Sequence, residues 1–269
     1  MASGALAADA PIAAWVDSLQ GAGRYTFTHR DLRQLAGRSV VAIDSALRRL
    51  KQKGRIQTPR RGFFVIVPVE YRAAGCPPAT WLVADLMRFL GQPYYVGILS
   101  AAALHGAAHQ QPMAFQVVTD KPTRPANAGR VRIEFHMSRV LKRTPVVEMP
   151  TDTGTIRVAS PEATAFDLVR YPAAAGYWSN VATVLGELAE RMQPEALDLC
   201  AAHQATPDVQ RLGYLLEFIE RQELADRLAT RLTGQRVRPV LLASKHKPGR
   251  AKPHPTWRVI PNVKVEVDQ

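Results

Sequence analysis

The pattern of apolar and polar positions over the first 70 residues predicts three short helices followed by a two-stranded hairpin. We expect helices at 11–19, 28–37 and 39–53, and strands at 55–58 and 63–67. Tyr25 and Phe27 alternate in a short extended piece of the kind that pairs with such a hairpin. The order helix, turn, helix and two-stranded wing predicts a winged helix-turn-helix, a DNA-binding unit, over residues 1–68.

The third predicted helix has one apolar face and an opposite face suited to DNA. Its apolar stripe, formed by Ile43, Leu47 and Leu50, is expected to face the core. Small and hydroxyl side chains near its start suit base edges in a major groove, and the basic side chains that follow suit phosphates. The predicted base contacts are Arg38, Ser39, Val41 and Ser45, and the predicted phosphate contacts are Arg48, Arg49, Lys51 and Lys53. Taken alone, this helix is equally compatible with a surface helix whose charges are solvated.

Two further places extend the predicted DNA-binding surface. Arg60 and Arg61 stand at the tip of the predicted hairpin, where a wing touches the DNA backbone or the minor groove. Thr28, the expected N-cap of the second helix, is counted with the same surface.

Beyond Pro68 the pattern changes to a longer succession of helices and strands. Residues 69–78 lack periodicity and end in a Pro-Pro pair, which predicts a linker. A second domain is expected at 79–244, with helices at 79–90, 98–108, 161–169, 177–192, 194–203, 207–219 and 223–232, and strands at 115–119, 131–136, 146–149 and 155–158. Residues 94–97 are expected to lead into the helix at 98, residues 121–129 to form a loop, and short extended runs to lie near 239–242, 256–260 and 263–267. The fold class is therefore α+β or α/β, a winged helix-turn-helix followed by a mixed sheet-and-helix domain.

The net charge of +12 is concentrated in two segments of the chain. Residues 1–70 carry 11 Lys and Arg against 5 Asp and Glu, residues 71–230 carry 15 against 16, and residues 231–269 carry 9 against 2. Clustered positive charge indicates a surface that binds a polyanion, because phosphate contacts and counterion release need a local cluster. For residues 231–269, which include the basic C-terminal extension at 245–269, a solvated surface without a partner remains an equal alternative.

Several classes of protein and site are disfavoured by the sequence. The apolar runs are far shorter than the ~20 residues that span a bilayer, and the N-terminus lacks the basic region of a secretory signal, so we expect a cytoplasmic protein. Cys76 and Cys200 lack the spacing of a zinc ribbon or disulfide framework and are expected to be buried thiols. No phosphate-binding loop, dinucleotide fingerprint or nucleophile elbow is present, so no cofactor is predicted.

Two weak patterns leave an enzymatic alternative open. His105 and His109 have the spacing of two metal ligands on a helix, but no third ligand is evident and helix packing is favoured. Asp120, Lys121 and Glu134 resemble the acidic and lysine residues of a nuclease core, although charges at strand ends explain them more simply. We therefore expect neither a metal site nor catalysis.

The segments YYVGILSAAALHGAAHQQPMAFQVVT, SPEATAFDLVRY and VQRLGYLLEFIE, behind an N-terminal winged helix, resemble the AbiEi family of type IV toxin-antitoxin antitoxins. The resemblance covers roughly residues 10–245. It implies an N-terminal domain that represses its own operon and a C-terminal domain that counters a nucleotidyltransferase-like toxin in abortive infection, a form of phage defence. Carried over to this sequence, it marks the antitoxin domain by Tyr95, Ser100, His105, Ser160, Pro161, Glu162, Asp167 and Arg211.

The leading hypothesis is thus a transcriptional autorepressor and antitoxin without enzymatic activity. Its expected partners are double-stranded operator DNA with inverted repeats, the toxin, and a second copy of the chain as a homodimer on DNA. The alternatives are a metal-dependent nuclease or nucleotidyltransferase-like enzyme targeted by a winged helix, and a regulator without a toxin partner. Asp167 is expected to pair with an arginine inside the domain, and Glu162 to act at a helix cap.

Overall fold

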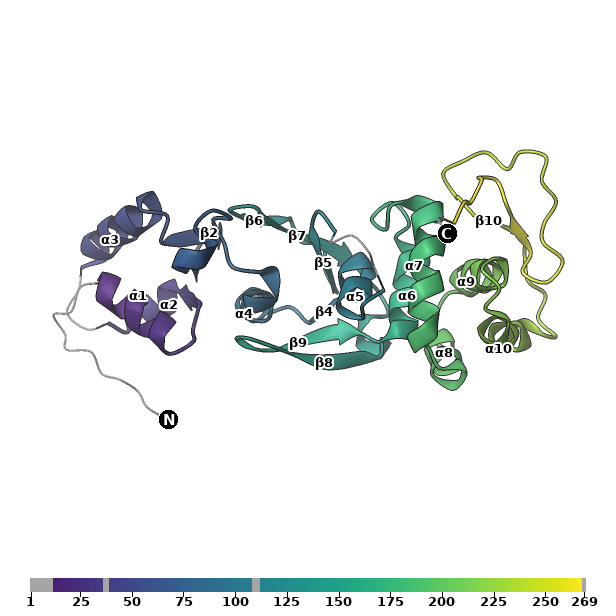
Figure 1. Cartoon of the computed structure of the whole chain (residues 1–269), viewed down its shortest axis with the longest axis horizontal. Coiled ribbons are helices and arrows are strands. Elements are labelled where there is room, and N and C mark those ends of the chain that lie inside the picture. The colour runs from purple at the N-terminus through teal and green to yellow at the C-terminus, as the bar shows by residue number, and fades with distance from the viewer. Residues whose placement is uncertain (1–11, 36–38, 108–111, 268–269) are drawn as a thin grey trace.

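The structure is a computed structural model that describes residues 12–35, 39–107 and 112–267. Figure 1 shows an elongated molecule with the N-terminal helices at one end, a sheet in the middle, and a group of helices with the C-terminal tail at the other end. The mixed α+β class predicted from the sequence is confirmed.

The N-terminal part contains three helices and a three-stranded antiparallel sheet. Its elements are α1 (Ile12–Gly21), β1 (Thr26–Thr28), α2 (His29–Arg33), α3 (Val40–Gln52), β2 (Ile56–Arg60) and β3 (Phe63–Ile66). The strands lie in the order β1-β3-β2, so the extended piece at Phe27 pairs with the hairpin as predicted. The core is formed by apolar side chains from all three helices and the sheet: Ile12, Val16, Leu19, Phe27, Leu32, Ile43, Leu47, Leu50, Ile56, Phe64 and Ile66.

Strand β3 is buried on both of its faces. Phe64 and Ile66 belong to the N-terminal core, whereas Phe63 and Val65 belong to the larger core of the remaining chain. This division follows from the strand itself, because successive side chains point to opposite faces of a sheet. The predicted linker continues the contact: it begins with a short turn, η1 (Val69–Tyr71), and Arg130 N donates to the carbonyl of Ala74 over 2.8 Å.

The middle of the molecule is a six-stranded mixed sheet in the order β6-β7-β5-β4-β9-β8. Its strands are β4 (Tyr94–Val96), β5 (Phe115–Thr119), β6 (Ala126–Ala128), β7 (Val131–Met137), β8 (Val146–Thr151) and β9 (Gly154–Ala159). The pairs β5·β7 and β4·β9 are parallel and the other three are antiparallel. The helices nearest to it are α4 (Val83–Leu90), preceded by the turn η2 (Ala79–Trp81), and α5 (Ile98–Leu104). A short turn, η3 (Leu141–Arg143), precedes β8.

The far end of the molecule is helical. It comprises α6 (Pro161–Arg170), α7 (Tyr177–Leu188), the turn η4 (Ala189–Arg191), α8 (Pro194–Ala201), α9 (Thr206–Phe218) and α10 (Gln222–Leu232). The tail then adds a two-stranded parallel pair, β10 (Val240–Leu241) and β11 (Val259–Ile260). Trp257 of the tail is 1% exposed and packs on α9 where Gly213 leaves room. A Cβ at Gly213 would lie 2.0 Å from Trp257 Cζ3, so this close approach requires glycine.

Five sequence predictions for single elements are wrong. The helix expected at 79–90 is divided by Leu82, and that expected at 98–108 ends at Leu104, because Gly106 takes φ +73. Residues 94–97 contain strand β4 instead of a lead into the helix, and the loop at 121–129 contains strand β6. Residues 263–267 form no strand. Both cysteines are buried as expected, and burial raises the pKa of each thiol to about 12.

Candidate DNA-binding face and a buried polar network

Helix α3 is fixed to the N-terminal core by one apolar stripe. Ile43, Leu47 and Leu50 are each at most 7% exposed and face α1 and the sheet. Ser39 caps the helix, because its hydroxyl accepts a hydrogen bond from Ala42 N over 3.2 Å. The hydroxyl that we predicted to meet a base therefore has a structural partner as well.

The opposite face of α3 is exposed and basic. Val40 and Val41, in its first turn, are 69% and 75% exposed, so none of the described residues covers them. Arg48, Arg49 and Lys51 follow on the exposed surface and Lys53 lies just beyond the helix. Within the described residues these four side chains form no ion pair. Ser45 is half-buried, and Arg38 lies outside the described residues.

The predicted contacts outside α3 lie in different surroundings. Thr28 forms a capping box with Asp31: its hydroxyl accepts from Asp31 N over 3.3 Å, and its own N donates to Asp31 Oδ2 over 2.7 Å. The guanidinium of Arg60 turns away from α3 and donates to the carbonyls of Pro125 and Arg124. It also lies 5.8 Å from the centre of the Phe135 ring. Arg60 thus belongs to the contact between the two parts of the chain.

Arg61, at the hairpin tip, remains exposed and lines a basic cleft of ≈ 730 Å³. The cleft lies between α2, the hairpin and α4, and its wall carries five arginines: Arg24, Arg30, Arg33, Arg61 and Arg88. Two carboxylates reduce this charge, because Asp31 lies 3.9 Å from Arg24 and Asp85 pairs with Arg88. Gly62 and Phe63 continue the wall towards Phe89, so the hairpin tip contacts the second domain instead of projecting freely.

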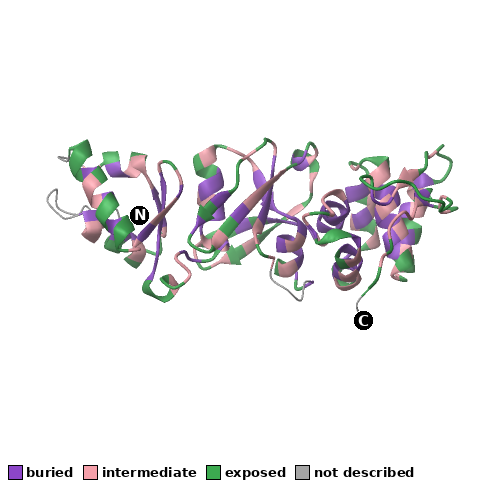
Figure 2. Ribbon diagram, turned by 90° about the horizontal axis from the view of Figure 1, so that it is seen from above, coloured by how far each residue is buried: buried purple, intermediate pink, exposed green. Residues whose placement is uncertain are grey.

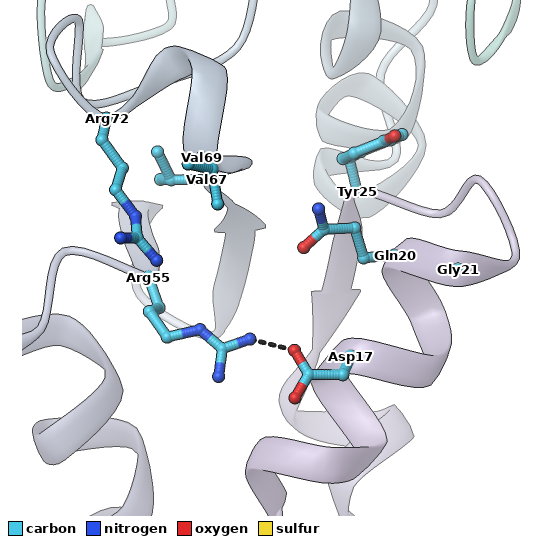
Figure 3. Close-up of a pocket in the computed structure, with 8 residues that line it drawn as sticks. All are labelled: Asp17, Gln20, Gly21, Tyr25, Arg55, Val67, Val69 and Arg72. Atoms are coloured by element: carbon cyan, nitrogen blue, oxygen red, sulfur yellow. Dashed lines mark hydrogen bonds and ion pairs between the residues drawn. The ribbon is translucent and has the colours of Figure 1, made fainter.

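A second, open cleft of ≈ 560 Å³ lies between α1 and the end of the hairpin (Figure 3). An ion pair between Asp17 and Arg55 spans it and ties α1 to the beginning of β2. Arg72 points into the same space from the turn after the hairpin. The ion pair therefore ties the helix to the sheet, and the described residues that line this cleft include no cysteine, serine, threonine or histidine.

A chain of polar side chains crosses the core of the second domain. Tyr95 of β4 donates its hydroxyl to Asp167 Oδ1 of α6 over 3.2 Å. Arg170, one turn further along α6, lies 3.6 Å from Asp167 and 3.2 Å from Asp208 of α9. Asp208 lies 3.6 Å from Arg211, whose Nε donates to the carbonyl of Leu241 in the tail. The chain joins three predicted residues, Tyr95, Asp167 and Arg211, through two that the sequence analysis missed.

Asp167 is the most constrained member of this network. It is 1% exposed, and its Oδ2 has no hydrogen-bond partner among the described residues. Burial raises the pKa of Asp167 to about 7, although Arg170 and the Tyr95 hydroxyl act in the opposite direction. Gly97 leaves the space for this carboxylate, because a Cβ there would lie 2.8 Å from Oδ2 and 2.7 Å from Val118.

The other residues marked for the second domain hold local structure. Ser100 Oγ accepts from Gln116 N over 2.9 Å, and His105 Nε2 lies 2.7 Å from the Ala159 carbonyl. Ser160 caps α6, whose first residue is Pro161. The Ser160 hydroxyl donates to Glu162, which accepts in turn from Gln193 N over 3.0 Å. Glu162 therefore works at a helix end as expected, by linking the start of α6 to that of α8.

The residues behind the enzymatic alternative are not brought together. Glu134 lies beside Gln116 of β5 in the sheet. Asp120 follows Gln116 by four residues, so Glu134 and Asp120 are about 13 Å apart along the strand direction. Glu134 also forms an ion pair with Arg132 over 2.8 Å. His109 lies outside the described residues. In the described part of the chain, no three His, Cys, Asp or Glu side chains gather where they would hold a metal ion.

Three comparisons with known proteins bear on these residues. Residues 95–218 match the AbiEi antitoxin C-terminal domain family, and no curated protein matches the chain. The crystal structure of the RV2827C protein from Mycobacterium tuberculosis is similar in fold, with a TM-score of 0.66 and 20% sequence identity over 91% of this chain and 88% of that one. Among the described residues, no helix has the length and apolarity needed to traverse a membrane.

Proposed function

We propose, from the match of residues 95–218 to the AbiEi antitoxin C-terminal domain family, that this chain is the antitoxin of a type IV toxin-antitoxin system and represses its own promoter. In this proposal the N-terminal part is a winged helix-turn-helix that binds inverted repeats of operator DNA. The second domain counters a nucleotidyltransferase-like toxin and supplies contacts for a homodimer on the DNA. The chain has no catalytic role in this scheme and acts in the cytoplasm, where the operator lies.

The exposed face of α3 is the observation that carries the DNA-binding part of the proposal. Two exposed valines precede a run of basic side chains without ion pairs in the described structure. Apolar contact with thymine methyl groups explains why valines remain uncovered at the start of a helix that enters a major groove. The basic side chains that follow are then in place for the phosphates on either side of the groove.

The elements around α3 support the same assignment. A short helix precedes it, a hairpin follows it, and β1 joins the sheet, which is the element order of a winged helix. The hairpin differs from a free wing, since Arg60 contacts the second domain. The proposed face therefore consists of α3 with Arg61, and excludes Arg60.

A binding titration with matched variants tests this face. Arg48→Ala with Arg49→Ala should reduce the slope of log affinity against log salt by about 1.8, because each phosphate contact contributes about 0.9. Lys142→Ala with Arg143→Ala, an exposed basic pair on η3, is the control with the same change in charge. Equal slopes for the two variants on the promoter duplex would remove α3 from the interface.

The antitoxin part is tested separately by growth. Co-expression of the chain with the proposed nucleotidyltransferase-like toxin should restore growth that the toxin inhibits alone. The Arg48→Ala, Arg49→Ala variant should lose repression of a promoter reporter and keep this rescue. Loss of rescue by a folded variant with normal abundance would show that antitoxin activity depends on DNA binding.

A further inference from the structure

The C-terminal tail carries a continuous excess of positive charge that the proposed function does not use. Between Leu232 and Val265 the sequence contains eight Lys and Arg and no Asp or Glu. Lys264 pairs with Glu266, and the other seven form no ion pair with any described residue. Those seven side chains are exposed: Arg236, Arg238, Lys245, Lys247, Arg250, Lys252 and Arg258.

The tail is a folded element and not a loose extension. Trp257 is buried against α9, and its Nε1 donates to Glu217 over 2.5 Å. Gln210 of α9 donates to the carbonyls of Trp257 and Arg238 over 2.8 and 3.0 Å. Four described residues of the tail, Leu242, Ala243, Trp257 and Val259, belong to the main apolar core. The tail thus completes the helical end of the molecule.

Residues 244–252, SKHKPGRAK, form a loop between the two tail strands that we call the basic loop. Asn262 holds its beginning, because the Asn262 amide donates to the carbonyls of Ala243, His246 and Lys247 over 2.9, 3.1 and 3.3 Å. Its Oδ1 accepts from Ala243 N over 2.9 Å. The beginning of the loop is fixed in this way, whereas all of its residues are exposed, as the green colour of the tail in Figure 2 indicates.

We propose that the basic loop and the tail around it are a second nucleic-acid-binding surface, which contacts the phosphate backbone without reading sequence. The surface lies at the opposite end of the long axis from α3 (Figure 1). The middle of the chain is nearly neutral, so the two basic surfaces are separate. This inference concerns residues beyond the matched family domain and does not depend on α3 binding DNA.

The composition of the loop favours a phosphate backbone over an acidic protein. Protein interfaces rely on buried aromatic or apolar anchors surrounded by polar residues. The basic loop contains no large apolar side chain, and the tryptophan of the tail is turned into the core. Binding to a phosphate backbone needs only a local cluster of cations that displaces condensed counterions.

Arg258 supplies a second, independent observation. Its φ is 55°, a left-handed backbone conformation that residues other than glycine rarely adopt. Its backbone N donates to the His254 carbonyl over 2.9 Å in a tight turn. Glycine would fit this turn with less strain. Backbone strain of this kind is concentrated at functional positions, which supports a contact made by the exposed Arg258 side chain.

The test measures affinity of the full chain for nucleic acid of random sequence as a function of salt. Lys245, Lys247, Arg250 and Lys252 are changed together to alanine, which removes no hydrogen bond or ion pair described for their side chains. The control changes four scattered exposed cations in the neutral middle, Lys121, Lys142, Arg157 and Arg191, to alanine. Fluorescence anisotropy is recorded with a 25-base-pair DNA duplex and an RNA duplex of equal length.

The loop variant should reduce the slope of log affinity against log salt by up to about 3.6 on duplex DNA, and the control should leave it near the wild-type value. When the salt concentration rises from 50 to 200 mM, the loop variant should therefore lose up to about 150-fold less affinity than the wild type loses. A change with DNA alone assigns the surface to DNA, and a change with both duplexes assigns it to either backbone. Equal slopes for the loop variant and the control on both duplexes would overturn the proposal.

Two more variants separate this result from folding and from α3. Arg258→Gly should lower the slope by about 0.9 while leaving the melting temperature unchanged or higher, since glycine relieves the backbone strain. The loop variant is also made together with Arg48→Ala and Arg49→Ala. If α3 does not bind DNA, the loop change should still lower the slope, so failure of one proposal is distinguishable from failure of the other.

Discussion

Replacing Asp167 by asparagine should change how stability depends on pH. Burial raises the pKa of this carboxyl from its ordinary value of 3.8 to about 7. Between these values the unfolded chain releases the proton and the folded chain retains it, so the free energy of unfolding falls as the pH rises. The difference corresponds to about 4 kcal/mol, at about 1.4 kcal/mol per pKa unit. This loss is absent below pH 3.8 and complete above pH 7.

Asparagine has nearly the same shape and no charge to bury. It retains an oxygen for the Tyr95 hydroxyl, and Arg170 keeps its pair with Asp208. The Asp167→Asn variant should therefore gain stability relative to the wild type as the pH rises from 4 to 7.

The measurement is urea unfolding followed by tryptophan fluorescence at pH 4.5, 6 and 7.5. Glu195→Gln, at an exposed carboxylate of α8, corrects for the change in net charge. A wild type that gains stability over the asparagine variant with rising pH would refute the reasoning, because it would mean that Asp167 is ionised and held by Arg170.

Three further predictions concern packing. Gly97→Ala should destabilise the chain by about 1–3 kcal/mol in chemical unfolding, because the new methyl group meets Val118 and Asp167; an unchanged midpoint would contradict the tight fit. Trp257→Ala should cost about 3–5 kcal/mol by the same assay, and a smaller loss than 1 kcal/mol would show that the tail does not belong to the core. Arg60→Ala should lower the free energy of unfolding by about 1–3 kcal/mol, because its hydrogen bonds to carbonyls are lost. Its affinity for promoter DNA in anisotropy titrations should be unchanged; a tenfold loss of affinity would show that Arg60 contacts the DNA.

Much of the fold follows from local patterns in the sequence. The strand-like run FQVVT predicts β5 to the residue, and the stripe of Ile43, Leu47 and Leu50 predicts the buried face of α3. Strands β4 and β6 escaped prediction because three residues are too few to show alternation. They form because neighbouring strands pair with them, which is information that local sequence does not contain.

The buried polar network was predicted only in part for a similar reason. Asp167 was expected to pair with an arginine, and Arg170 stands three residues later on the same helix. Asp208 and Arg211 have the same spacing on α9, so each half of the network has a helical signal. The two pairs are joined by the contact of Arg170 with Asp208, which depends on how α6 packs on α9. The spacing of residues within a single helix contains no information on that packing.

The placement of β3 in two cores has a consequence for how the protein comes apart. Phe63 and Val65 of β3 lie in one core, and Phe64 and Ile66 lie in the other. Unfolding of either core therefore exposes one apolar face of β3 to solvent and destabilises the core that remains. The two parts should consequently unfold as one cooperative unit, with a single transition by fluorescence and calorimetry. A fragment that stops at Pro78 would expose an apolar sheet face and tend to self-associate. In the intact molecule the same strand gives the N-terminal part, which carries α3, a rigid mechanical connection to the rest of the chain.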